Sequence, residues 1–508
     1  MLIKMTVISA ALAISLCLVG CVEENQQAFS ATNDMNSDIS IAQIPTKKKP
    51  NIILILADDM GYGDLGSYNH NSKIPTPSID ALAVEGVRFT TAHAPSSVCT
   101  PTRYGILTGE YAWRTWLKSG VLIGHSRSLI AKDKLTIAGW LQGLGYNTAA
   151  IGKWHLGFGS EGADFSKKVD LRPTTLGFDD FFGISASLDM PPYAYIHNGL
   201  YVQTPTEKIE TRRAGIELDK FPYWSAGPIA PDFDFTQVEP TITEKAVTFI
   251  ETQKSTGKPY FLYLPYPAPH TPIVPSDEFS GSSQAGIYGD FVAQIDASVG
   301  RILNAVEKNG DKENTIIMFT SDNGAITFSY LDKLGHATNG DLRGMKSQVY
   351  EGGHRVPLLV SWPSQFKPTV SDRFVSLVDF FATFAELLGE TVPEIQGVDS
   401  RSFADVLTRR GANDQPRRSQ IIGHSMLGHF TIRSGDWKLI LSDGPGGFDI
   451  NLSSPHKYAD GETIARVDWR LFNLAKDPQE QNNVAEENPQ VVERLYQQLR
   501  KVQDSDAI

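Results

Sequence analysis

Three almost continuous apolar runs stand out along the chain, at residues 51–57, 259–264 and 314–320. Each is rich in β-branched or aromatic residues and lacks the alternation of apolar and polar positions that marks a half-exposed strand. Such runs are typical of strands that are covered on both faces of a sheet. The sequence therefore predicts that these three segments are buried strands.

Amphipathic helices and further strands lie between these runs. Strands are predicted at 87–93, 145–152 and 356–362, and helices at 77–86, 135–144, 242–253, 285–309 and 376–388. A helix is also expected to begin near Arg103, which places Cys99 close to a helix N-terminus, where backbone N–H groups favour an anion. Residues 190–239 are rich in Pro, Tyr and Asp with little periodicity, and they are interpreted as an insertion around a pocket.

The pattern changes beyond about residue 395. Short strands are predicted at 431–433, 437–441 and 468–473, followed by a terminal helix at 488–503. These elements indicate a small C-terminal subdomain.

The first fifty residues have a different pattern from the rest. Residues 1–20 carry one early charge, Lys4, and then an apolar run that is typical of a signal peptide rather than a membrane span. The run ends in Leu18-Val19-Gly20-Cys21, which resembles a bacterial lipobox, so Cys21 is expected to carry lipid; an ordinary secretory signal cleaved elsewhere is the alternative. Residues 21–49 are polar and aperiodic, and they are expected to form a flexible tether.

Charge and cysteine content narrow the possibilities. The formal net charge is −12, which argues against a nucleic-acid partner and means that an anionic substrate must meet local positive charge. Of the three cysteines, Cys17 lies in the predicted signal and Cys21 is the predicted lipid site, so Cys99 alone remains and cannot form an internal disulfide.

Oxygen donors follow two of the buried strands. Asp58 and Asp59 come directly after the first run, and Asp322 and Asn323 follow the third. Buried carboxylates are costly unless they are paired or bind a metal, and hard oxygen ligands suit Ca²⁺, with Mg²⁺ the weaker option. A solvated pair of aspartates in a turn is the alternative for Asp58 and Asp59. The adjacent Gly61–Gly66 segment matches G-x-G-x-x-G, but no helix follows it, so a dinucleotide site is rejected.

Candidate cations and proton carriers also follow predicted strands. Lys153 and His155 come after the strand at 145–152, and an extended segment would place both side chains on one face. His270 lies in a loop with four prolines, which would fix its direction. Lys346 lies in a Gly-rich segment before the strand at 356–362.

Several separated motifs together resemble the formylglycine-dependent sulfatases of the alkaline phosphatase superfamily. They are Cys99-Thr100-Pro101-Thr102-Arg103, Gly152-Lys153-Trp154-His155, and Gly344-Met345-Lys346 with Glu351-Gly352-Gly353. The resemblance implies an α/β fold, with a large mixed β-sheet sandwiched by helices, and a small C-terminal antiparallel sheet. It implies a catalytic domain at 50–394 and a C-terminal subdomain at 395–508.

The resemblance also implies roles for the site residues. Cys99 would be oxidised by a formylglycine-generating enzyme to Cα-formylglycine, and Arg103 would hold the modified residue. Ca²⁺ would be bound by Asp58, Asp59, Cys99 in its modified form, Asp322 and Asn323. Lys153 and Lys346 would offset charge on the sulfate, with Ser187, or else Ser185, in contact with it. Asp322 would accept a proton, His270 would protonate the leaving alcohol, and His155 would act in the second half-reaction.

The expected activity is therefore hydrolysis of sulfate esters on a sulfated polysaccharide or oligosaccharide. An exported lipoprotein, anchored on the periplasmic or the cell-surface side of an outer membrane, would suit that role. The alternatives are a phosphate or phosphonate ester hydrolase of the same superfamily, a sulfate transferase, and a non-catalytic glycan-binding lipoprotein with unconverted Cys99.

Overall fold

The computed structural model describes residues 48–158, 164–213, 222–393, 396–408, 417–448 and 468–505. The predicted signal peptide, nearly all of the tether and the predicted domain boundary at 394–395 lie outside these ranges. Among the described residues, we find no helix with the length and apolar character needed to cross a membrane.

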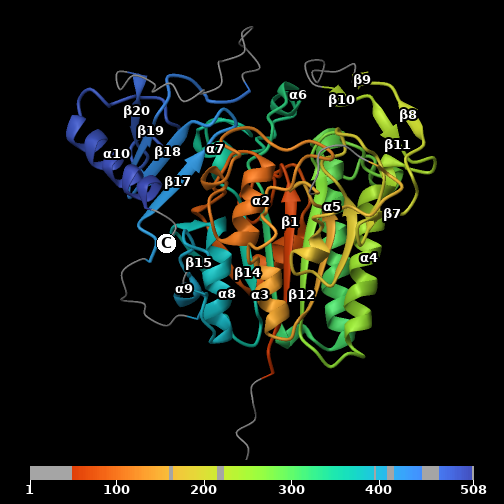
Figure 1. The fold of residues 1–508 in the computed structure, drawn as a ribbon. Coiled ribbons are helices and arrows are strands. Elements are labelled where there is room, and N and C mark those ends of the chain that lie inside the picture. The colour runs from red at the N-terminus through yellow and green to blue at the C-terminus, as the bar shows by residue number, and fades with distance from the viewer. Residues whose placement is uncertain are drawn as a thin grey trace, which may run out of the picture. The chain divides into compact units, whose positions relative to one another are not determined.

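A ten-stranded mixed sheet organises the fold (Figure 1), in the order β15-β2-β14-β13-β1-β12-β4-β5-β6-β7. Its strands are β1 (Asn51–Asp58), β2 (Val87–Phe89), β4 (Asn147–Lys153), β5 (Asp180–Ile184), β6 (Ile196–His197), β7 (Leu200–Tyr201), β12 (Tyr260–Pro269), β13 (Thr315–Ser321), β14 (Leu358–Ser361) and β15 (Thr369–Ser371). The central strands β4, β12, β1 and β13 are parallel, and β14 is antiparallel to β13. The three apolar runs are therefore adjacent strands in the middle of the sheet.

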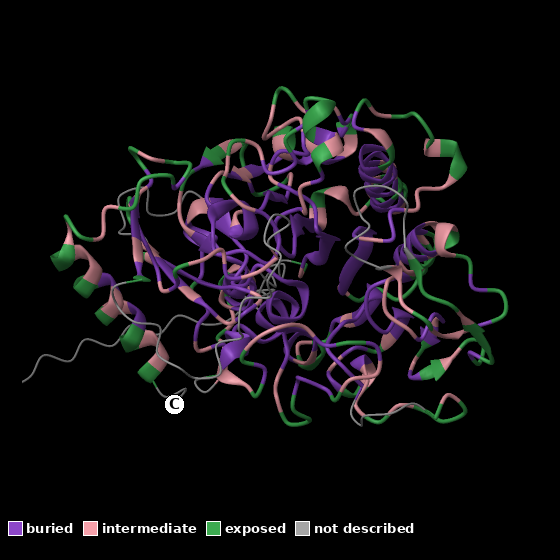
Figure 2. Cartoon of the chain, turned by 90° about the horizontal axis from the view of Figure 1, so that it is seen from above, coloured by how far each residue is buried: buried purple, intermediate pink, exposed green. Residues whose placement is uncertain are grey.

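Helices cover both faces of this sheet. In β1, Ile52, Leu54 and Leu56 share one apolar core with α2, α3 and α8, while Ile53 and Ile55 share the other core with α1, α4 and α5. The helices are α1 (Pro77–Glu85), α2 (Cys99–Thr108), α3 (Ile137–Gly143), α4 (Val238–Gln253), α5 (Gly286–Asn309) and α8 (Phe380–Leu388). Alternate residues of β1 face opposite layers, so the strand must be apolar throughout. Figure 2 shows the resulting buried interior, with exposed residues concentrated at the rim.

A second, four-stranded antiparallel sheet follows near the C-terminus, in the order β17-β18-β19-β20. Its strands are β17 (Gln420–His424), β18 (Phe430–Ser434), β19 (Trp437–Ile440) and β20 (Arg470–Asn473), and helix α10 (Pro489–Asp504) shares their apolar core. This sheet confirms the predicted C-terminal architecture.

Two segments of the structure differ from the sequence prediction. The strand predicted at 87–93 is divided into β2, in the main sheet, and β3 (Ala92–His93), which pairs with β16 (Val375–Ser376) instead. The aperiodic region 190–239 contains β6, β7 and the short strands β8 (Glu207–Ile209), β9 (Arg212–Arg213), β10 (Pro222–Trp224) and β11 (Gly227–Ile229). These strands are too short to produce a periodic signal in the sequence.

Candidate active site

The candidate site lies where the central parallel strands end. Asp58 is the last residue of β1, and Lys153 is the last residue of β4. His270 follows β12 directly, and Asp322 follows β13. Because parallel strands end at a common edge of the sheet, residues far apart in the sequence come together there.

Helix α2 brings Cys99 to the same edge. Cys99 is its first residue, and Pro101 is accommodated because N–H groups of the first turn have no intrahelical partner. The Cys99 Sγ lies 3.4 Å from Asp58 Oδ1, and the side chain is buried. The predicted proximity of Cys99 to a helix N-terminus is therefore confirmed.

Three carboxylates and three cations meet around Cys99. Lys153 Nζ lies 2.5 Å from Asp58 Oδ2, and Lys346 Nζ lies 2.8 Å from Asp59 Oδ2. Arg103 donates to Asp322 Oδ2 through Nε at 3.0 Å and through Nη2 at 2.7 Å. All six side chains are buried, so the cluster is stable only because its opposite charges are paired.

Burial and neighbouring charges shift several pKa values here. Burial, followed by the negative charge of Asp322, raises the pKa of the Cys99 thiol well above its ordinary value. Burial and the nearby Asp58 raise the pKa of Asp322. Burial alone would also raise the pKa of Asp58, but Lys153 and other cations hold it well below its ordinary value. The site therefore favours a protonated thiol rather than a thiolate at Cys99.

The residues fit a divalent cation. One ligand atom from each of Asp58, Asp59, Cys99 and His270 lies within 4.8 Å of the others. The Oδ1 of Asn323 is buried and has no hydrogen-bond partner in the part of the chain that the structure describes, while its Nδ2 donates to Asp59 Oδ1 at 2.7 Å. An unpartnered amide oxygen beside carboxylates is the donor chemistry that Ca²⁺ and Mg²⁺ use.

His155 does not lie on an extended segment, contrary to the sequence prediction. Strand β4 ends at Lys153, and His155 has a φ of 57°. Its Nε2 lies 2.7 Å from the carbonyl oxygen of Leu122, so Nε2 carries the proton and donates it. The buried Nδ1 has no partner among the described residues. Burial and the charge of Lys153 lower the pKa of His155 well below its ordinary value, which leaves a neutral ring with a free lone pair.

His270 has the opposite arrangement. Its Nδ1 lies 2.6 Å from the carbonyl oxygen of Thr271, and its Nε2 lies 3.6 Å from Asp59 Oδ2. Both ring nitrogens of His270 thus face oxygen atoms, in contrast to those of His155. The proline-rich sequence around His270 continues β12 as far as Pro269, so the strand itself fixes the position of the ring.

Residues 50–390, well over half of the chain, match the family model for sulfatases. The chain belongs to the sulfatase family.

Known relatives of this sulfatase match over nearly their whole length. An N-acetylgalactosamine-6-O-sulfatase of Bacteroides thetaiotaomicron is 35% identical over 491 residues, covering 90% of this chain and 93% of the relative. Human arylsulfatase A is 33% identical over 488 residues, covering 92% and 90%. A solved B. thetaiotaomicron sulfatase, described with the metabolism of multiple glycosaminoglycans, superposes with a TM-score of 0.78 at 33% identity, covering 90% of this chain and 99% of that one.

These similarities confirm the predicted enzyme class and fold. The sulfatase is a sulfuric ester hydrolase with an alkaline phosphatase-like fold, a large mixed sheet between helices and a small antiparallel sheet.

A pocket of about 150 Å³ opens beside Cys99 in the sulfatase. Predicted site residues line it: Cys99, His155, Ser187, His270 and Lys346. Of the two serines considered from sequence, Ser187 is the one in the pocket wall, and its buried Oγ has no partner within the described ranges.

Other pocket residues were missed from the sequence. Met190 begins the predicted insertion and Asp189 directly precedes it, whereas Met426 and Phe448 come from the C-terminal region. The insertion could be identified from its composition as a region around the pocket. The approach of Met426 and Phe448 depends on packing between elements distant in sequence, for which the chain has no local signal.

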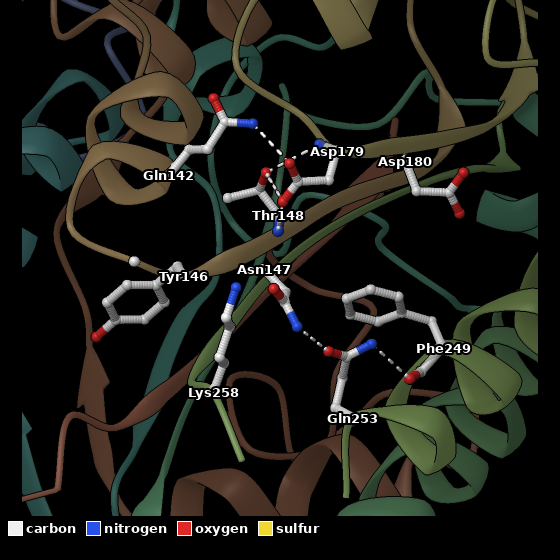
Figure 3. Close-up of a pocket in the computed structure, with 10 residues that line it drawn as sticks. Gln142, Tyr146, Asn147, Thr148, Asp179, Asp180, Phe249, Gln253 and Lys258 are labelled. Carbon is white, nitrogen blue, oxygen red and sulfur yellow. Dashed lines mark hydrogen bonds between the residues drawn. The ribbon is translucent and has the colours of Figure 1, made fainter. Parts of the chain in front are cut away.

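A larger groove, of about 440 Å³, lies at the opposite ends of the strands, beside Asn147 of β4. In Figure 3 two pairs of its side chains are hydrogen-bonded: Gln142 donates to Asp179 at 2.6 Å, and Asn147 donates to Gln253 at 2.8 Å. The described residues that line the groove include no cysteine or histidine, so we assign catalysis to the smaller pocket at Cys99 despite the groove's greater volume.

Proposed function

We propose that this sulfatase removes sulfate from a sulfated polysaccharide or oligosaccharide, with Cys99 acting after conversion to Cα-formylglycine. The observation that carries the proposal is Cys99 at the start of α2, buried between Asp58 and the cations of the site. The relative that acts on N-acetylgalactosamine-6-O-sulfate supports a glycan substrate.

The state of the thiol supports conversion. A cysteine nucleophile needs a thiolate, and reactive cysteines have lowered pKa values. Here burial raises the pKa of Cys99, so the unmodified thiol is a poor nucleophile. Conversion by a formylglycine-generating enzyme would supply a hydrated aldehyde whose hydroxyl group attacks sulfur.

We propose Ca²⁺ as the metal, held by Asp58, Asp59, Asp322, Asn323 and the modified residue 99. The Oδ1 of Asn323, which has no partner among the described residues, supports this; the three carboxylates are meanwhile balanced by Lys153, Lys346 and Arg103. A bound dication would make the site positive overall and would offset negative charge on the sulfate oxygens.

The chain's own cations position the ester. Lys153 and Lys346 would bind sulfate oxygens, with Ser187 as a hydrogen-bond donor from the pocket wall. Arg103 is held by Asp322 and donates through Nη1 to the carbonyl of Lys153 at 3.0 Å, so it connects α2 to the end of β4. It therefore orients residue 99 relative to Lys153.

Proton transfers follow from the two histidines. His270, with both nitrogens facing acceptors, is the proposed acid that protonates the leaving alcohol, assisted by Lys346. His155, neutral and with no partner for Nδ1 among the residues described, is the proposed base of the step that releases sulfate. Asp322, whose pKa burial raises, is the proposed acceptor of the attacking hydroxyl's proton.

We further propose an exported bacterial lipoprotein, anchored through lipid on Cys21 at an outer membrane. The apolar segment 1–20 and the sequence Leu18-Val19-Gly20-Cys21 support this location. Sulfated polysaccharide outside the cell would be within reach of a tethered enzyme.

The test compares initial rates on an aryl sulfate, a matched aryl phosphate and sulfated oligosaccharides. We expect hydrolysis of the aryl sulfate and of at least one oligosaccharide, and intact mass of the peptide containing Cys99 should show replacement of the thiol by an aldehyde. Cys99→Ala should abolish turnover while leaving the melting temperature nearly unchanged. An unmodified thiol in a fully active enzyme, or preference for the phosphate, would contradict the proposal.

A further inference from the structure

A short hairpin from the insertion is hydrogen-bonded to segments at the active-site pocket. Strands β9 and β10 pair antiparallel, with Arg212 opposite Trp224. The next residue, Ser225, donates its N–H to the carbonyl of Asp189 at 3.0 Å, and the Tyr223 hydroxyl donates to the carbonyl of Ile273 at 2.8 Å. Asp189 lines the pocket, and Ile273 follows two residues after Thr271, which also lines it.

Figure 1 places this hairpin at the end of the molecule toward which β1 points. That is the end of the sheet at which Asp58 and Cys99 lie. The hairpin and the pocket therefore lie at the same end of the sheet.

An aromatic platform fixes one guanidinium on this hairpin. The Cζ of Arg212 lies 5.1 Å from the ring centroid of Trp224 and 5.7 Å from that of Tyr223. Trp224 in turn stacks on Phe235, with centroids 4.7 Å apart and planes at 9°, and its Nε1 donates to the carbonyl of Glu210. Stacking on an immobile ring limits the motion of the guanidinium plane.

The N–H groups of Arg212 remain available. The side chain is exposed, and within the described ranges it makes no hydrogen bond or ion pair. By comparison, Arg103, Arg114 and Arg418 are each bound to a carboxylate. A stacked guanidinium with a free edge is suited to bidentate binding of a planar or tetrahedral oxyanion.

We propose that Arg212 is a second anion-binding subsite, which takes a sulfate or carboxylate on the sugar next to the one being desulfated. This inference rests on the proposed glycan substrate and makes it a polyanionic glycan. The sulfate that is cleaved already has Lys153 and Lys346, so Arg212 serves a different group. Because the chain carries a net charge of −12, a polyanion needs such local positive charge at the pocket rim.

The experiment measures kcat and KM on four substrates: an aryl sulfate, and three sulfated disaccharides whose second sugar is sulfated, carboxylated or neutral. In Arg212→Ala, KM should rise about 10-fold for a disaccharide with a second anionic group, as expected for loss of one charge-assisted hydrogen-bond pair. The kcat and KM for the aryl sulfate and the neutral disaccharide should stay within about twofold of wild type, since surface substitutions usually have small effects on the fold. Comparison of the sulfated and carboxylated disaccharides shows whether Arg212 binds sulfate, carboxylate or both.

Three variants serve as controls. Arg212→Lys keeps the charge but loses the planar fork, so we expect a smaller rise in KM. Trp224→Ala should raise KM for the same substrates as Arg212→Ala does. Trp224→Phe should leave these KM values near those of wild type, because an aromatic ring is retained. Arg500→Ala removes an exposed arginine that pairs with Asp504 on α10 and should change nothing.

Two results would overturn the inference. One is an unchanged KM for both charged disaccharides in Arg212→Ala, and the other is an equal loss on all four substrates with an unchanged melting temperature. A wild-type enzyme that cleaves the aryl sulfate but none of the disaccharides would instead overturn the glycan substrate on which the inference rests.

Discussion

The two histidines of the site differ in which ring nitrogen has a partner. His155 donates from Nε2 to Leu122, and its Nδ1 has no partner in the described part of the chain, whereas both nitrogens of His270 face oxygen atoms. A ring nitrogen with a free lone pair can accept a proton, and a ring nitrogen that carries a proton can donate it. The local hydrogen bonds thus separate the two proposed proton-transfer roles.

This separation predicts different responses to the leaving group. A good leaving group needs little acid assistance, so an aryl sulfate should be hydrolysed by His270→Ala far better than an alkyl sulfate is. His155→Ala should lose activity on both, by roughly 10²–10⁴-fold, because release of sulfate does not depend on the departed alcohol. Steady-state rates on a series of aryl and alkyl sulfates check this. Rescue of His155→Ala, rather than His270→Ala, by a good leaving group would mean that the assignments are reversed.

Asn323 gives the metal proposal a separate test. Its unpartnered Oδ1 should bind Ca²⁺, so chelation of the wild type should lower the melting temperature, and Asn323→Ala should show a smaller shift on addition of Ca²⁺. A ligand at 100 times its dissociation constant stabilises a fold by about 2.7 kcal/mol. Thermal unfolding with and without Ca²⁺, together with elemental analysis, measures both effects. Zinc or magnesium at one equivalent, or no metal, would contradict the assignment of Ca²⁺.

Some of these residues could be predicted from sequence and others could not. Asp58 and Asp322 follow long apolar runs, so their positions at the edge of the sheet follow from strand burial alone. The left-handed backbone of His155 has no such signal, because its conformation depends on the tertiary contact with Leu122. Met190 begins the aperiodic region 190–239, where no period indicates which side chains face the pocket.

At the scale of elements, a buried charge network connects the short helix α7 (Glu351–His354) to the C-terminal sheet. Glu351 accepts from Lys438 at 3.0 Å and from Arg433 at 2.7 Å, and its Oε2 lies 3.0 Å from His93 Nε2. Lys438 also lies 2.9 Å from Glu480. The segment that carries Lys346 leads directly into α7, so this network holds the segment from the side of the C-terminal sheet.

The network predicts a pH-dependent contribution to stability. Burial alone would raise the pKa of Glu351, but Lys438 and the other cations lower it well below its usual 4.5. A lowered folded-state pKa stabilises the fold above the unfolded value, and this stabilisation is lost as the pH falls toward the folded value. Glu351→Gln should therefore lose about 3 kcal/mol at pH 7, as when one partner of a buried pair is removed, and less below pH 4.

Urea denaturation of wild type and Glu351→Gln at several pH values measures that difference. Glu386→Gln is a matched control, because this glutamate pairs with Arg417 on the surface and should cost little at any pH. A stability difference between wild type and Glu351→Gln that stays constant as the pH falls from about 4 toward about 2 would contradict the proposed charge effect.

The glycine motif after β1 shows what a sequence pattern can leave unexplained. No helix opens on these glycines, which argues against a dinucleotide site, and the structure shows another use for them. A Cβ on Gly61 would lie 2.1 Å from the Thr338 carbonyl oxygen, and one on Gly63 would lie 2.2 Å from that of Ala337. Close contact between two loops requires glycine here, and only the folded structure identifies the partner loop.

At the scale of the whole molecule, the described body already brings together every predicted site residue from Asp58 to Lys346. The loop with Met426 and the residue Phe448, both from the C-terminal region, complete the pocket wall. Catalysis should therefore depend on the body that begins near residue 48 and not on the preceding segment. Cellular location, in contrast, should depend on the segment before it.

Two cysteines of that segment allow the location to be tested apart from catalysis. Cys21→Ser removes the proposed lipid acceptor, and buried lipid CH₂ groups each contribute about 0.8 kcal/mol to membrane binding. We expect this variant to appear in the soluble fraction of exported protein, with kcat and KM on an aryl sulfate equal to wild type. Cys17→Ser is the matched control, because Cys17 lies within the predicted signal and its loss should leave the mature enzyme anchored. Cell fractionation, with mass analysis of the N-terminal peptide, measures the location and the lipid. Retention of Cys21→Ser in the membrane would contradict the lipid anchor, since no other acceptor cysteine precedes Cys99 in the predicted mature chain.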